Sequence, residues 1–285
     1  MSNLRSLSLI ASIACSFAAA SASADPGSGA SALGTTSVDQ RPQEPAGERG
    51  ASAAAVADAG LLLPSVMAPS IHRGAAFGAA RSGYDSSSDA FVARAVAEAS
   101  LTSYLALRLD FEHGPSMGPD NHLRIGGRLQ LLRAEDHGFD GAVALFYDAN
   151  EFREEGNIVA GLLASKRLGR VGIFGNLLFG SDPEGDDQAL EARLGGMYRV
   201  APSFELGVDA RGRYNLSSDE KRAGTLTRDW ELHALPTASF AVGSFALVAE
   251  AGLSAQQTTG PFGQPNEVTE TRAGILAMAG AAGAF

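Results

Sequence analysis

Alternating apolar and polar positions dominate the chain from about residue 71 onward. The stretch Phe204–Leu216 shows the pattern most clearly, because its even positions are apolar or small while odd positions include Glu205, Asp209 and Arg211. A repeat of two places successive side chains on opposite faces of a β-strand. The sequence therefore predicts a strand with one apolar face and one charged face.

Similar segments recur between breaks that are rich in turn residues, and they predict about 12 strands, or 10 if the weak first two fail to form. Each is about 10–14 residues long, which is close to what a tilted membrane-crossing strand needs. The predicted strands are 71–82, 89–99, 104–113, 122–135, 141–152, 157–167, 171–181, 188–200, 204–216, 229–241, 245–255 and 270–285.

The breaks between these strands alternate in length. Ala201–Ser203 is short and Ser217–Arg228 is long; Gly243–Ser244 is short and Gln256–Glu267 is long. Short turns at one rim and long loops at the other are typical of an antiparallel up-and-down barrel in a membrane. The spacing therefore favours an all-β transmembrane barrel over a soluble sandwich.

Aromatic residues on the apolar faces fall into two groups near the strand ends. Phe204 and Tyr214 are ten residues apart on one strand, and Trp230 and Phe240 are ten apart on the next. At about 3.3 Å per residue and with strand tilt, that spacing gives about 25 Å, the height of the apolar band between aromatic girdles. The same parity predicts two girdles: Phe111, Tyr147, Phe179, Tyr214 and Trp230 at the long-loop rim, and Tyr198, Phe204, Phe240, Phe245 and Phe285 at the short-turn rim.

The N-terminus has the pattern of a secretory signal peptide over residues 1–24. Arg5 supplies a positive start, Leu7–Ala20 is apolar but too short to span a bilayer, and Ala22–Ala24 fits a cleavage site. Cys15 lies within the apolar stretch, and its surroundings fit a lipid-attachment site poorly. We expect an exported protein whose barrel occupies residues 71–285.

Residues 25–70 are rich in Ala, Ser, Gly and Pro, and this composition predicts a disordered segment. Its simplest interpretation is a flexible lead before the barrel. The alternative is a segment that plugs the barrel or makes contacts in the periplasm.

Composition limits the kinds of partner. Charged residues make up 19% of the chain and the formal net charge is −10, which argues against nucleic acid. The single cysteine lies in the predicted signal peptide, so the exported chain would have no disulfides and no thiolate metal sites. No phosphate-binding glycine loop is present, and we expect no cofactor.

The final segment, Arg272–Phe285, ends on phenylalanine after an alternating Ala- and Gly-rich run. In this it resembles the C-terminal signature of bacterial outer-membrane β-barrel proteins. The resemblance covers about residues 71–285 and implies residence in the outer membrane, contact with its lipid, and insertion by the barrel assembly machinery.

The polar faces collect charges that we expect to line the lumen. Centring a turn at Pro202 pairs Arg199 with Glu205 and Glu191 with Arg213, and it sets Arg193 against Arg211, with Asp209 diagonal to soften the repulsion. The full predicted set is Arg108, Asp110, Glu112, Arg124, Arg128, Asp148, Glu191, Arg193, Arg199, Glu205, Asp209, Arg211, Arg213, Glu231, His233 and Glu250. These charges either fill the barrel as salt-bridged ladders or line a narrow channel for small polar solutes.

Other candidate chemistry is weaker. A two-residue turn at Gly243–Ser244 would set His233 opposite Ser254 with Glu231 nearby, which are the residue types of a hydrolase triad. His113 and His122 flank a loop, and 182–187 is acidic, but neither has the spacing of a known metal motif, so no metal site is predicted. Pro236 lies within a predicted strand, where we expect a local bulge or a strand boundary.

The sequence therefore predicts an outer-membrane barrel with a passive role, either a narrow porin-like channel or a structural surface protein, and not an enzyme. Two alternatives stay open: a hydrolase inside the lumen built on Ser254, His233 and Glu231, and a secreted soluble barrel that binds an apolar ligand.

Overall fold

The structure is a computed structural model. It describes residues 67–71, 74–114, 121–150, 156–185, 187–217, 227–260 and 267–284. The predicted signal peptide, most of the segment 25–70, and Phe285 lie outside the described residues.

In the described part of the chain, twelve antiparallel strands form one closed barrel, as the alternation predicted. They are β1 (Ala76–Asp85), β2 (Ala90–Ser100), β3 (Leu105–His113), β4 (Asn121–Leu132), β5 (Asp140–Asn150), β6 (Asn157–Leu168), β7 (Val171–Ser181), β8 (Gln188–Ala201), β9 (Phe204–Ser217), β10 (Thr227–Val242), β11 (Phe245–Gly260) and β12 (Val268–Ala284). One helical turn, α3 (Ala134–His137), connects β4 to β5. No helix in the described part of the chain is long and apolar enough to cross a membrane.

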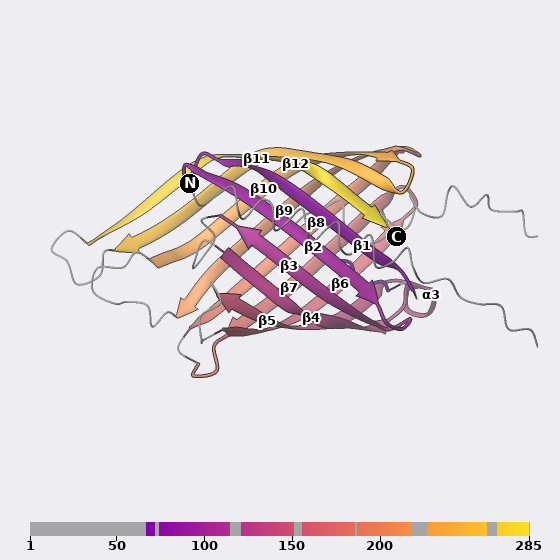
Figure 1. The fold of residues 1–285 in the computed structure, drawn as a ribbon, viewed down its shortest axis with the longest axis horizontal. Coiled ribbons are helices and arrows are strands. Elements are labelled where there is room, and N and C mark those ends of the chain that lie inside the picture. The colour runs from indigo at the N-terminus through magenta and orange to yellow at the C-terminus, as the bar shows by residue number, and fades with distance from the viewer. Residues whose placement is uncertain are drawn as a thin grey trace, which may run out of the picture.

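Each strand pairs with its neighbours in sequence, and β1 closes the barrel against β12. Figure 1 shows the tilted strands, with the C-terminal end of β12 and α3 at the same end of the barrel. The connections Pro202–Ser203 and Gly243–Ser244 belong to this short-turn rim, whereas β9–β10 and β11–β12 are joined at the other rim. Closure leaves no free strand edge, which is what a spanning sheet requires.

Alternation along the strands separates the two faces of the barrel. On β9, Leu206, Val208 and Tyr214 are exposed on the outside, whereas Glu205 and Asp209 are buried on the inside. The apolar face therefore points outward and the charged face inward, the reverse of a soluble barrel with an apolar core.

The first strand begins later than predicted. β1 begins at Ala76, and Gly74 just before it has a positive φ of +73°. Ala75 accepts a hydrogen bond from the backbone N–H of Ser100 at the rim. Residues 67–71 lie inside the barrel, with Met67 and Ala68 each 1% exposed.

Pro236 corrects another expectation, since it lies in the middle of an unbroken strand without a bulge. The β10–β11 register is the same on both sides of it, from Ala234↔Leu253 to Thr237↔Glu250, but the positions between are not paired. Gly252 faces this gap, where an added Cβ would lie 2.9 Å from the Pro236 ring. A glycine on β11 thus makes room for the ring, and the Thr237 hydroxyl donates to the Leu235 carbonyl at 3.1 Å.

Candidate functional site: the charged lumen

All sixteen predicted lumen residues lie on the inner face of the barrel. Asp110, Glu112, Arg199 and Arg213 are partly buried, and the other twelve are buried. They are held there by strand parity, because alternate residues of a strand share one face. The inner wall is therefore charged but largely shielded from water.

The register across Pro202 is confirmed: Arg199 pairs with Glu205, Glu191 with Arg213, and Arg193 with Arg211. The Arg199–Glu205 ion pair forms at 2.8 Å.

The side chain of Glu191, however, turns to other cations. Its carboxylate accepts from Arg193 Nε at 2.8 Å, Arg211 Nε at 2.5 Å and Arg124 Nη1 at 3.2 Å. One carboxylate thus bonds to both of the opposed arginines, Arg193 and Arg211.

This network extends across the bore. Arg211 on β9 donates to Glu112 on β3 at 2.8 and 3.0 Å, and Glu112 also accepts from Arg94 Nε on β2 at 3.2 Å. Arg94 in turn lies 3.3 Å from His233 Nδ1 on β10. Side chains from opposite walls therefore meet, and they constrict the lumen at this level. We call Arg94, Glu112, Arg124, Asp148, Glu191, Arg193, Arg211 and His233 the constriction.

Sequence analysis missed several inward charges. Arg94 and Glu98 lie on the Ala-rich strand β2, and Arg81 and Asp85 lie on β1, which was predicted poorly. Period-two parity could have found them once the limits of these strands were known. Arg81 is 3.9 Å from Glu250, and Glu98 pairs with both Arg108, at 3.5 Å, and Arg128.

The candidate triad residues Ser254, His233 and Glu231 lie close together, but Ser254 and His233 are not hydrogen-bonded to each other among the contacts described. Ser254 is opposite His233 in the register, as predicted. Its hydroxyl donates to Asp85 Oδ2 at 2.9 Å and lies 3.0 Å from the Ser87 hydroxyl. His233 Nε2 contacts Glu231 at 3.0 Å, and its Nδ1 faces Arg94. Both ring nitrogens are thus engaged by groups other than Ser254.

The histidines and the acidic loop have structural partners. His113 Nδ1 is 2.9 Å from Asn121 Oδ1, and His122 Nδ1 is 3.4 Å from Asp148 Oδ1. Asp182 Oδ1 accepts backbone N–H groups from Gly185 and Asp187 at 2.7 and 3.1 Å, which organises the loop. No group of three or more potential metal ligands is found in the described part of the chain.

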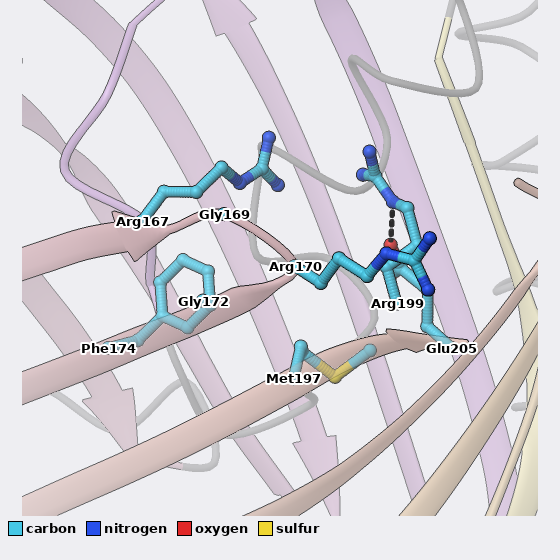
Figure 2. Close-up of a pocket in the computed structure, with 8 residues that line it drawn as sticks. All are labelled: Arg167, Gly169, Arg170, Gly172, Phe174, Met197, Arg199 and Glu205. Atoms are coloured by element: carbon cyan, nitrogen blue, oxygen red, sulfur yellow. Dashed lines mark hydrogen bonds and ion pairs between the residues drawn. The ribbon is translucent and has the colours of Figure 1, made fainter. Parts of the chain in front are cut away.

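The short-turn rim holds a small recess between β6, β7, β8 and β9. Figure 2 shows the arginines Arg167, Arg170 and Arg199 around it, with Phe174 and Met197 beside them. Arg199 is bonded to Glu205 there. Because Arg167 and Arg170 also line the recess, its arginines outnumber its carboxylates.

The outer face carries the predicted aromatic residues near the strand ends. Tyr147, Phe179, Tyr198, Tyr214, Phe240 and Phe245 are exposed, whereas Phe111, Phe204 and Trp230 are partly buried. Between these ends the exposed side chains are aliphatic, such as Leu194 at 64% and Leu253 at 69%.

Comparison with known proteins gives a likeness of fold. No family model matches the sequence, and no curated protein matches it. The NanC porin structure has a TM-score of 0.51 at 10% identity, over 73% of this chain and 98% of that one. The KdgM porin has a TM-score of 0.47 at 8% identity, over 74% and 99%, and an outer membrane channel from Pseudomonas putida F1 has 0.40 at 12%, over 76% and 97%. The chain therefore has a fold similar to that of the NanC porin, a closed antiparallel β-barrel.

Proposed function

We propose that this protein is a bacterial outer-membrane β-barrel whose lumen is a narrow channel for small polar solutes. The observation that carries the proposal is the inverted barrel, which is aliphatic outside and charged inside. Exposed residues such as Leu145, Leu162 and Leu247 form part of an outer surface that water would solvate poorly. Lipid is the solvent that suits this face.

The constriction supports a narrow channel over a wide pore. Arg211 and Glu112 reach each other from opposite walls, so only small solutes or ions could pass beside them. Both signs of charge are present at this level, which favours polar solutes over apolar ones. A soluble barrel for an apolar ligand would need the opposite arrangement of its two faces.

Insertion by the barrel assembly machinery is part of the same proposal. Support comes from β12, which consists of Ala, Gly and larger apolar residues from Ala273 to Ala284 and pairs with β1 to close the barrel.

Two measurements on the full-length protein test the proposal. Heat-modifiable gel mobility and outer-membrane fractionation test the membrane location, and extraction into buffer without detergent would disprove it. Planar-bilayer recordings test the channel, with heat-denatured protein as the control. We expect small current steps from the wild type and larger steps from Glu112→Ala. Silence of both proteins, when correctly folded, would favour a structural surface role instead.

A further inference from the structure

The inner walls of β4 and β7 hold polar side chains that bind the backbone of residues 67–71. Asn176 on β7 accepts the Met67 N–H at 2.7 Å and donates to the Met67 carbonyl at 2.8 Å. Gln130 on β4 accepts the Ile71 N–H at 3.0 Å. Asn176 and Gln130 are each 5% exposed, so their amides are directed at the segment and away from bulk water.

Arg128 on β4 adds a third contact with the backbone. Its guanidinium donates to the Ala68 carbonyl and, at 3.2 Å, to the Ser70 carbonyl. Glu98 holds the guanidinium in place through Arg128 Nε at 2.9 Å. All of these bonds go to main-chain atoms, so the wall recognises a peptide backbone rather than a particular sequence.

Two side chains of the segment are anchored in apolar parts of the lumen. Met67 packs in a cluster with Phe146, Leu163 and Leu178, and Ala68 belongs to a second cluster with Phe174 and Met197. This apolar lining has no use in a water-filled pore, but it suits a peptide that passes through the barrel. The segment thus has polar contacts along its backbone and apolar contacts at one end.

We propose that the inner wall of β4 and β7 is a binding site for a peptide segment, that residues 67–71 occupy it, and that they partly close the channel. Binding is independent of the function proposed above, whereas closure rests on it. Opening requires the segment to leave Asn176, Arg128 and Gln130, after which water or another peptide strand would replace it.

Cysteine labelling of the full-length protein tests the binding site. In a Cys15→Ala background, Met67→Cys places a thiol in the segment, and Ser203→Cys places one in an exposed turn as a reference. We expect a large maleimide reagent to label position 203 rapidly and position 67 slowly. Equal labelling of the two positions in the folded protein would overturn the binding site, whatever the barrel conducts.

Asn176→Leu removes both hydrogen bonds to Met67 at similar volume. We expect labelling of position 67 to become about tenfold faster, because two lost hydrogen bonds shift the bound fraction by about that factor. Ser239→Ala is the matched control, since Ser239 is buried on the inner face of β10 and is not among the residues described as bonding to the segment. If Ser239→Ala also accelerated labelling of position 67, or if Asn176→Leu left its rate unchanged, the role of Asn176 would be contradicted.

Bilayer recordings of the same variants test closure. We expect Asn176→Leu to pass several times more current than the wild type, and Ser239→Ala to match the wild type. If Asn176→Leu is labelled faster but passes the same current as the wild type, closure is overturned and the channel stands. Faster labelling with silence in every variant would count against the channel while the binding site stands.

Discussion

Arg211 on β9 and Glu112 on β3 form a salt bridge at 2.8 Å, although β9 and β3 lie six strand positions apart in either direction around the barrel. The bond therefore crosses the bore instead of following the wall. A ring of twelve strands can bring opposite side chains together in this way only where long arginine and glutamate side chains face each other. This contact narrows the lumen at its level.

A double-mutant cycle measures the Arg211–Glu112 contact directly. We expect Arg211→Gln and Glu112→Gln to show a coupling energy of about 0.5–3 kcal/mol, since the two groups touch. The measurement is reversible unfolding in lipid vesicles. Glu112→Gln with Arg199→Gln is the control, and it should be additive because Arg199 lies at the rim. Additivity of the first pair would show that the bridge does not form.

Glu191 holds three arginines, and its neutralisation should be costly. We expect Glu191→Gln to lower the free energy of unfolding by about 3–5 kcal/mol, because it leaves buried cations without their shared anion. Glu205→Gln is matched in chemistry, but its partner Arg199 is 35% exposed, so a loss of only about 0.2–1 kcal/mol is expected. Urea titration compares the two, and equal losses would contradict the central place of Glu191. Glu191→Gln should also shift ion selectivity toward anions, because it removes a negative charge from the lumen. Reversal potentials under a salt gradient measure this shift.

The outer face of β9 tests which residues meet lipid. Val208 lies between Phe204 and Tyr214, so Val208→Arg should cost about 2–4 kcal/mol in a bilayer. Leu216 lies beyond Tyr214 on the same face, and Leu216→Arg should cost about 0–1 kcal/mol. Folding titrations in vesicles measure both costs. A larger penalty at Leu216 than at Val208 would contradict the predicted positions of the aromatic girdles.

The β1–β12 seam depends on close backbone contact at Gly280. An added Cβ there would lie 2.0 Å from the Ala80 carbonyl oxygen, so Gly280→Ala should destabilise the barrel by about 1–3 kcal/mol. At Gly196 on β8 the same Cβ meets nothing within 4 Å, and Gly196→Ala should be neutral or stabilising by about 0.4–1 kcal/mol. Thermal shift of the heat-modifiable band ranks the two variants. A stable Gly280→Ala would show that the strands can move apart.

Local periodicity was enough to predict the barrel but not the limits of its first strand. The limits of β7 match the prediction at both ends, because Val171–Ser181 alternates cleanly between turns. The limits of β1 do not, because Ala and Gly give weak contrast between its faces. Pro236 was misjudged for a different reason: the space that accommodates it is provided by Gly252 on another strand, which no local pattern reveals.

Side-chain pairs between neighbouring strands of the lumen wall could be predicted from the sequence, whereas pairs across the bore could not. Pairs joined by one turn, such as Arg199 and Glu205, follow from counting outward from Pro202. Arg211 and Glu112 are brought together only by the curvature of the closed barrel, and strand parity carries no information on that. The contacts of Met67 with Asn176 could not be predicted either, because the composition of residues 25–70 predicts a disordered segment and gives no contacts.

The position of residues 67–71 constrains the order in which the molecule is assembled. Pairing of β1 with β12 joins residues about 200 apart in sequence, so the entropy of loop closure places it late in folding. The segment binds β4 and β7, and these contacts span 60 residues from Ala68 to Arg128 and 109 residues from Met67 to Asn176, fewer than the seam spans. It can therefore be bound while the sheet is still open, as a template around which the later strands curl, and the final seam then encloses a peptide that never has to be threaded through a finished ring.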